Sequence, residues 1–202
     1  DSHQVLEWLN REDIPTLAKV NAKKLASNFE SQSTDGTALV TLTQDDLGAL
    51  GIKNLGDLDA VLDGCADREE TWINGTIRDL TRALFEAGHA HTLEVWRDSR
   101  IIGGVYGITL GGAFFGESMF SRDTDGSKIA LAWLVDHLNR AGFTLFDTQF
   151  ITPHLASLGA IEIPRNSYRA RLIEALDVQA SFDAIDLETD PQAVVQRITQ
   201  TS

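Results

Sequence analysis

The sequence has almost no cysteine and no long apolar segment. Its 202 residues include a single cysteine, Cys65, which excludes an internal disulfide framework and makes a cytoplasmic location the expectation. No CxxC pair or His/Cys cluster indicates a structural zinc site. No apolar run approaches the roughly 20 residues that a membrane-spanning helix needs. Since no signal-like segment opens the sequence either, we expect no membrane partner.

Basic residues are also scarce. Lys and Arg total 17 against 30 Asp and Glu, which gives a formal net charge of −13. A broad surface for sequence-independent nucleic-acid binding needs many phosphate-facing Lys and Arg side chains, so the charge argues against such a surface. A local contact with one nucleotide or with an RNA end stays compatible with this composition.

Three common active-site motifs are missing. No GxxxxGK[ST] occurs, so a P-loop is excluded. The glycine pairs Gly103-Gly104 and Gly111-Gly112 fall within or between expected strands and open no helix, which argues against a dinucleotide fingerprint. Ser118 does not stand in a nucleophile elbow, because Phe120 occupies the place of the second glycine.

Residues 3–64 show the spacing of short helices. Val5, Trp8 and Leu9 recur at helical intervals, and Gly51 suits the end of a helix. Helices are predicted around residues 4–10, 15–30, 44–50 and 57–65. No strand-like alternation is visible, so this half is predicted to be a small bundle of about five helices.

From about residue 66 the pattern becomes mixed. A helix is predicted over 77–89, with Ile77, Leu80, Leu84 and Phe85 on one face. Strands are predicted over 91–97, 101–110, 113–120 and 144–150, and further helices over 127–142, from about 164, and over 191–200. The order α-β-β-β-α-β-α is typical of an α+β layer structure, in which the first three strands form an antiparallel meander.

Two polar residues interrupt the last apolar strand. Asp147 and Gln149 are two positions apart, so on a strand they would share a face. A buried carboxylate is costly unless it has a partner or a task. Either Asp147 is satisfied by nearby backbone amides, or it belongs to a site at the mouth formed with the following loop.

Other polar and aromatic residues have two readings each. Glu117, on the third predicted strand, either orients a polar ligand group or lies at a rim. Trp72 either stacks on a base or belongs to the core. His89 and His91, two positions apart, would form half of a metal site, but a structural role is favoured because no third ligand is near in sequence, and we expect no metal.

Several sequence blocks resemble leucyl/phenylalanyl-tRNA–protein transferases. They are DGCADREETWIN, GHAHTLEVW, GGVYGITLGGAFFGESMFSR, SKIAL and FDTQFITPHLASLGAIEIPR. The match runs almost continuously from about Val61 to Phe182, and we assign residues 61–202 to this likeness. The resemblance implies an acetyltransferase-like (GNAT-like) antiparallel or mixed sheet with flanking helices, behind the small helical bundle. Coenzyme A is not implied, because the Q/RxxGxG/A pyrophosphate loop is not evident.

The resemblance also implies an activity and its residues. The enzyme would take Leu, Phe or Met from the 3′ end of its tRNA, as co-substrate and without a cofactor, and join it to the N-terminal Arg or Lys of an acceptor protein, which marks that protein for degradation. Asp147 would accept the proton of the attacking amine or hold the amine and the cationic end of the acceptor, and Gln149 would relay the proton or orient the amine. Glu117 would contact the aminoacyl group, and Trp72 would stack near the terminal adenosine. The aminoacyl pocket would be formed by Val105, Phe114, Met119, Leu131, Leu134 and Phe146.

The N-terminal half departs from that family. It resembles a sterile alpha motif (SAM) domain over residues 3–64, on landmarks such as Trp8-Leu9, Asp35-Gly36 and Leu50-Gly51-Ile52. The predicted boundary therefore separates residues 1–64 from the transferase-like residues 65–202. The family's own N-terminal domain, which helps to hold the aminoacyl-tRNA end, has no counterpart here. The alternative is a non-catalytic or impaired fusion whose SAM-like half mediates self-association or binds a protein partner.

Overall fold

The protein is built around one mixed sheet. The computed structural model describes residues 18–20, 50–53 and 57–200, and over these residues seven strands are ordered β2-β3-β4-β5-β6-β1-β7. Neighbouring strands are antiparallel except β5 and β6, which pair in parallel. The strands are β1 Ala18–Val20, β2 Leu50–Lys53, β3 Ala90–Arg97, β4 Arg100–Leu110, β5 Ala113–Ser121, β6 Leu145–Asp147 and β7 Ala160–Glu162.

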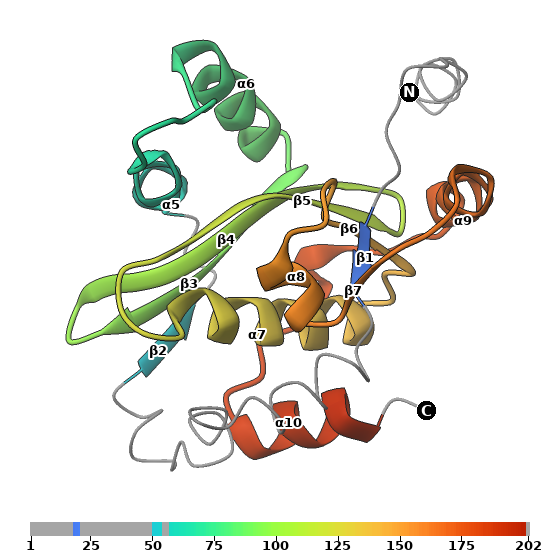
Figure 1. Cartoon of the computed structure of the whole chain (residues 1–202). Helices are drawn as coiled ribbons and strands as arrows, with labels where there is room; N and C mark the ends of the chain where they lie inside the picture. Colours follow the sequence, from blue (N-terminus) through green and yellow to red (C-terminus); the bar gives the residue numbers. More distant parts are fainter. Residues whose placement is uncertain (1–17, 21–49, 54–56, 201–202) are drawn as a thin grey trace.

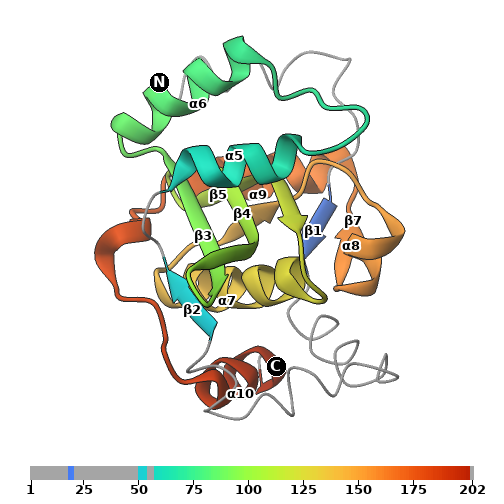
Figure 2. The same ribbon diagram turned by 90° about the vertical axis from the view of Figure 1, so that its left-hand side faces the viewer.

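Helices cover both faces of this sheet. Helices α5 (Leu58–Ala66) and α6 (Gly75–Glu86) lie on one side, and α7 (Gly126–Arg140) lies on the other with α10 (Pro191–Gln200) beyond it (Figures 1 and 2). Helix α9 (Arg165–Leu176) packs on β5 and β6. The short helix α8 (Pro153–Ser157) and the 3-10 turn η1 (Phe182–Ala184) complete the described elements. The predicted α+β class, with a mixed sheet and flanking helices, is confirmed.

The predicted meander is confirmed as β3, β4 and β5, and its turns explain the sharp reversals. Asp98 and Ser99 have φ of 49° and 64°. Two consecutive residues in the left-handed region are typical of a two-residue hairpin turn whose twist matches that of the strands. Gly111, with φ of 56°, makes the second reversal, where an added side chain would collide with the backbone of α9.

Strand β3 is buried on both faces, although its sequence alternates. Leu93 and Val95 belong to the core cluster that contains the buried residues of α7, while Thr92 and Glu94 are also buried, and α5 and α6 both pack on β3. Glu94 is fully enclosed and accepts hydrogen bonds from the Thr92 hydroxyl at 2.7 Å, the Asp57 backbone N–H at 3.1 Å and the Trp96 indole at 3.3 Å. These donors offset the cost of removing a carboxylate from water.

Three expectations were wrong in detail. The face predicted for α6 included Leu80, which is 57% exposed, whereas Thr81 is the buried residue and bonds back to the Ile77 carbonyl. The strand predicted over 144–150 ends at Asp147, because the chain turns away from β5 there.

The third error concerns the N-terminal half. Residues 18–20 and 50–53 form the strands β1 and β2, whereas a helix was expected around 15–30 and Gly51 was expected to end a helix. Such short strands carry too little alternation to be detected. The helices predicted around 4–10 and 44–50 lie outside the described residues, apart from Leu50.

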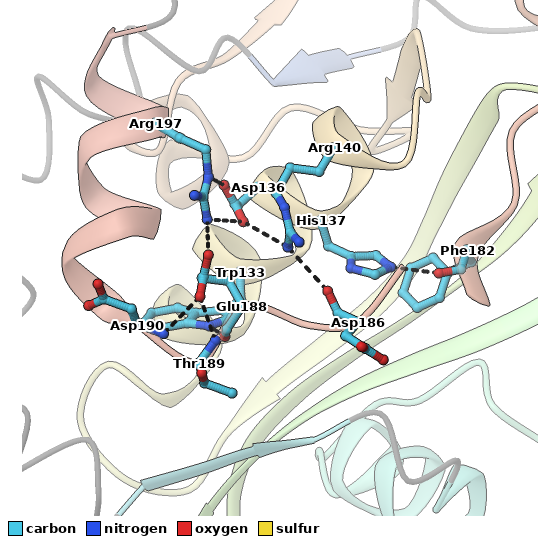
Figure 3. A network of polar contacts seen from close by, with 10 residues as sticks. All are labelled: Trp133, Asp136, His137, Arg140, Phe182, Asp186, Glu188, Thr189, Asp190 and Arg197. Carbon is cyan, nitrogen blue, oxygen red and sulfur yellow. Dashed lines mark hydrogen bonds and ion pairs between the residues drawn. The ribbon is translucent and has the colours of Figure 1, made fainter. Parts of the chain in front are cut away.

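The C-terminal segment is fixed to α7 by polar contacts (Figure 3). Arg197 of α10 donates to both carboxylate oxygens of Asp136, at 2.6 and 3.1 Å, and also to Glu188 at 2.8 Å. The Trp133 indole donates to the Glu188 carbonyl at 2.9 Å. The His137 ring bonds the Phe182 carbonyl at 2.7 Å. We call residues 182–200 the C-terminal strap, since these contacts hold it along the outer side of α7.

Candidate functional site

The candidate site lies where β5 and β6 separate. The two strands pair in parallel only from Ala113↔Leu145 to Phe115↔Asp147. Beyond that point β5 continues through Glu117, while the chain after Asp147 bends toward α8. Diverging strands leave room for side chains and for a ligand between them, as at other strand ends in α/β sheets.

Asp147 is almost completely buried, with 2% of its surface exposed. Burial raises the pKa of its carboxyl group, and two hydrogen bonds oppose that effect. The Gln149 backbone N–H donates to Oδ1 at 2.7 Å, and the Tyr168 hydroxyl donates to Oδ2 at 2.9 Å. Both oxygens are therefore held by neutral donors, one of which is a backbone amide, as the non-functional interpretation had required.

Gln149 joins Asp147 to the second carboxylate. Its backbone has φ of 63°, which turns its N–H toward Asp147. Its side-chain amide donates to Glu117 Oε1 at 2.9 Å. Burial raises the pKa of Glu117, and the negative charge of Asp147 adds to this effect. The structure thus brings the three predicted polar residues together, through the turn after β6 rather than through one continuous strand face.

A pocket of about 600 Å³ opens beside these carboxylates. Glu117 and Met119 of β5 line one wall, and Thr148, the chain neighbour of Asp147, lines another. Its size is within the range of small-molecule sites, which are typically 300–1,000 Å³. Asp147 itself is not exposed to the pocket and lies one residue behind its wall.

Two exposed aromatic side chains line the same pocket. Trp72 is 48% exposed and Phe150 is 65% exposed, which is unusual for residues of their size. Trp72 precedes α6, where Asn74 caps the helix by accepting a hydrogen bond from the Ile77 N–H at 3.1 Å. The cap fixes the end of the segment that carries the indole. The core interpretation of Trp72 is therefore wrong, and the ring is available for stacking.

Two arginines line the pocket together with two acidic residues, Asp67 and Glu117. Arg68 donates to the Met119 carbonyl at 2.7 Å and to the Ser118 hydroxyl at 3.2 Å, so its guanidinium lies along β5. Arg122 lies over the Phe120 ring at 5.3 Å from its centroid. Arg68, Arg122 and Phe150 were not predicted, because their place in the pocket depends on contacts between residues far apart in sequence.

The six predicted pocket residues come together in one apolar cluster. Val105, Phe114, Leu131 and Leu134 are buried members of it, and Met119 and Phe146 pack against it as partly buried residues. Of these six, only Met119 also lines the pocket described above. The cluster therefore adjoins the pocket through β5, and its role in holding an aminoacyl side chain stays a prediction.

The histidine pair does not meet as a metal site would. His91 is buried, bonds the Thr109 hydroxyl at 3.1 Å and stacks on Phe182 with ring centroids 4.4 Å apart. Burial lowers the pKa of His91. His89 is exposed at the end of the α6–β3 turn. In the part of the chain that the structure describes, no three His, Cys, Asp or Glu side chains are grouped to hold a metal ion, and no described helix is long and apolar enough to cross a membrane.

The fold and the paired carboxylates fit a group-transfer enzyme, and comparisons with known proteins narrow that class to the aminoacyltransferases. The family model described as leucyl/phenylalanyl-tRNA protein transferase matches residues 49–173. The chain belongs to this family. A transferase of that name from Ruegeria pomeroyi is 65% identical over 146 residues, covering 72% of this chain and 69% of that protein. The one from Paracoccus denitrificans is 56% identical over 146 residues, covering 72% and 68%.

A second family model, that of the SAM (sterile alpha motif) domain, matches residues 1–63. The two models share residues 49–63, which include most of α5. In the structure α5 buries Val61 and Leu62 against the sheet, in a cluster with Tyr106 and Phe120. The predicted boundary after residue 64 stays a prediction.

Among solved structures, aminoglycoside N-acetyltransferase AAC(6′)-Iy in complex with CoA superposes with a TM-score of 0.37 and 15% identity. The match covers 69% of this chain and 92% of that one. At this score the likeness supports no conclusion about the site.

Proposed function

We propose that this chain transfers leucine, phenylalanine or methionine from aminoacyl-tRNA to the N-terminal Arg or Lys of acceptor proteins and so marks them for degradation. The observation that carries the proposal is the Asp147–Gln149–Glu117 arrangement beside a pocket with exposed Trp72 and two arginines. Family membership supports the reaction class.

The reaction is aminolysis of an ester that is already activated, so the proposal needs no cofactor beyond aminoacyl-tRNA. An α-amine has a reference pKa of about 8 and is partly neutral near neutral pH. As its nitrogen attacks the ester carbonyl it must lose a proton, and Asp147 is the proposed acceptor. Holding the amine and the ester together supplies much of the rate, which is the role proposed for Gln149 and Glu117.

The pocket suits the end of a tRNA despite the net charge of −13. Exposed Trp72 and Phe150 offer stacking surfaces for a base, and Arg68 and Arg122 supply positive charge for a phosphate. The apolar cluster that includes Val105, Phe114 and Leu131 is the proposed site for an unbranched or γ-branched apolar side chain. β-Branched side chains would fit it poorly.

A transfer assay tests the proposal directly. Labelled Phe-tRNA is mixed with an acceptor peptide that begins with Arg, and a peptide that begins with Ala serves as the control. We expect transfer to the Arg peptide by the parent chain and strongly reduced transfer by Asp147→Ala. A folded parent that transfers nothing would contradict the proposal.

A second function is favoured by the SAM match over residues 1–63. SAM-like modules mostly mediate protein interactions, so the N-terminal half would drive self-association or bind a partner. Sedimentation of the full chain over a range of concentrations tests this. Concentration-dependent assembly without transfer would favour an interaction protein, and a monomer at all concentrations would argue against self-association.

A further inference from the structure

A buried tyrosine, Tyr168, contacts the proposed proton acceptor from a different element. Its hydroxyl donates to Asp147 Oδ2 at 2.9 Å, and the residue is 3% exposed. Tyr168 lies in the first turn of α9, 21 positions from Asp147 in sequence. Its ring is packed in a cluster with Ala113, Leu145 and Leu172, separate from the cluster that adjoins the pocket. The hydroxyl therefore has a fixed position at the buried end of the site.

The protonation of this pair has a definite direction. Burial strongly raises the pKa of the Tyr168 hydroxyl, and the negative charge of Asp147 raises it further. Tyr168 therefore remains the donor at any pH at which the protein works. A donor that stays protonated favours the ionised form of its acceptor, so this bond opposes the rise that burial causes in the pKa of Asp147.

Each carboxylate oxygen of Asp147 accepts a hydrogen bond from a different donor. Gln149 fixes Oδ1 through a backbone N–H whose direction depends on a φ of 63°, and Tyr168 fixes Oδ2. Among the contacts described for these residues, the charged side chain of Glu117 on β5 meets the pair through Gln149, and Lys19 on β1 is the backbone register partner of Asp147. Without Tyr168, Oδ2 would lose its donor in a buried position, which favours protonation or reorientation of the carboxyl group.

We propose that Tyr168 is the positioning residue that keeps the Asp147 carboxylate oriented, with its Oδ2 atom hydrogen-bonded, for proton acceptance in aminoacyl transfer. This inference rests on the proposed function. In the transfer step the amine nitrogen forms a bond to the ester carbonyl carbon, and the bond from that carbon to the ribose oxygen breaks. The proton leaves the nitrogen for Asp147, and Asp147 then gives it up to the departing ribose oxygen, which regenerates the carboxylate. Tyr168 neither gives nor takes a proton overall.

The test uses the full chain and Tyr168→Phe, which keeps the ring in its cluster and removes only the hydroxyl. The matched control is Tyr106→Phe. Tyr106 is also buried, at 1% exposure, but its hydroxyl has no hydrogen-bond partner among the described residues. Transfer of Phe from Phe-tRNA to an Arg-starting peptide is measured over a range of pH for each protein.

We expect kcat of Tyr168→Phe to fall about tenfold or more with a smaller change in KM, since a hydrogen bond to a charged group is lost at the reacting centre rather than at the binding surface. The acidic limb of the pH profile moves to higher pH, while Tyr106→Phe keeps the parental profile. Parental kcat and pH profile in a folded Tyr168→Phe would overturn the proposal.

A second measurement separates this inference from the proposed function. The carboxyl carbon of Asp147 is titrated by ¹³C NMR in the parent and in Tyr168→Phe, and its signal is assigned by its absence from Asp147→Asn. We expect a higher pKa of Asp147 in Tyr168→Phe. An unchanged pKa overturns the inference even if transfer occurs, whereas a raised pKa in a chain that transfers nothing overturns the proposed function instead.

Discussion

Two aspartates in this molecule are equally buried but have different hydrogen-bond and ion-pair partners. Asp147, at the end of β6, and Asp136, on α7, are both 2% exposed. Asp136 forms an ion pair with the Arg197 guanidinium, and one of its carboxylate oxygens lies 3.7 Å from Nη1 of Arg140. Its negative charge is therefore compensated by cations (Figure 3). The bonds given to Asp147 come instead from Tyr168 and from a backbone amide. Asp136 is thus paired with cations, whereas the hydrogen-bond donors described for Asp147 are neutral groups, and a buried carboxylate in such surroundings is a candidate for proton transfer.

The strongest test of this difference is to neutralise Asp147. Asp147→Asn keeps the shape of the side chain and can still bond Tyr168 and the Gln149 N–H, so the fold should be retained. We expect transfer to fall about a hundredfold or more, the usual contribution of a positioned general base. Single-turnover transfer of labelled Phe measures the effect, and circular dichroism verifies folding. Transfer within twofold of the parent would remove Asp147 from the mechanism.

The matching change at the other aspartate should affect stability instead. Asp136→Asn removes the buried partner of the Arg197 guanidinium, which then keeps only the partly exposed Glu188 carboxylate at 2.8 Å. Breaking a buried ion pair typically costs 3–5 kcal/mol, and we expect about 2–3 kcal/mol here because Arg197 is itself 39% exposed. Urea unfolding measures the loss. Transfer per folded molecule should stay near the parental value. A loss of transfer as large as that of Asp147→Asn would contradict the assignment of Asp136 to stability alone.

The contrast extends to the tryptophans. Trp72 is half exposed at the pocket, whereas Trp133 is buried under the strap with its indole bonded to Glu188. We expect Trp72→Ala to raise KM for Phe-tRNA about tenfold, since stacking contributes about 1–3 kcal/mol per base. Its melting temperature should hardly change.

The control for Trp72→Ala is Leu80→Ala on α6. Leu80 is 57% exposed and does not line the pocket, so its removal tests whether any exposed apolar side chain would have the same effect. Equal KM values for the two variants would mean that Trp72 makes no specific contact.

The smallest expected effect is the pH dependence of stability at the site. Burial raises the pKa of Asp147 above its value in the unfolded chain, so the native state binds more protons in the interval between the two values. The contribution of this group is therefore greatest below the unfolded pKa and is lost as pH rises through the native pKa. Asp147→Asn should gain in melting temperature relative to the parent as pH increases over that interval. A constant difference at all pH values would contradict the assignment.

Regular periodicity made most of the long elements predictable. The apolar spacing located α6, α7, α9 and α10, and apolar runs bounded by turn residues located β3 to β5, because these elements are long enough to carry a clear pattern. The exposure of Leu80 was not predicted, since the buried position of α6 is taken by the polar residue Thr81, whose hydroxyl is satisfied by the Ile77 carbonyl.

The site was predictable only in part, for a physical reason. Asp147 and Gln149 stood out because polar residues are costly in an apolar strand, and Glu117 stood out for the same reason. Tyr168 looks like an ordinary apolar residue of α9, and Arg68 meets Met119 across 51 positions of sequence. Only the packing of α9 on β6, and of the segment after α5 on β5, brings these partners together.

One consequence concerns which residues position 149 can accept over time. Gln149 combines a left-handed backbone, a main-chain bond to Asp147 and a side-chain bond to Glu117. Glycine would suit the backbone but lacks the amide, and asparagine tolerates that backbone but is one methylene shorter. Glutamate has the length but would add a third carboxylate between two others. Each single replacement therefore loses one of the three properties. We expect substitutions at position 149 to be accepted less often than at other half-buried positions.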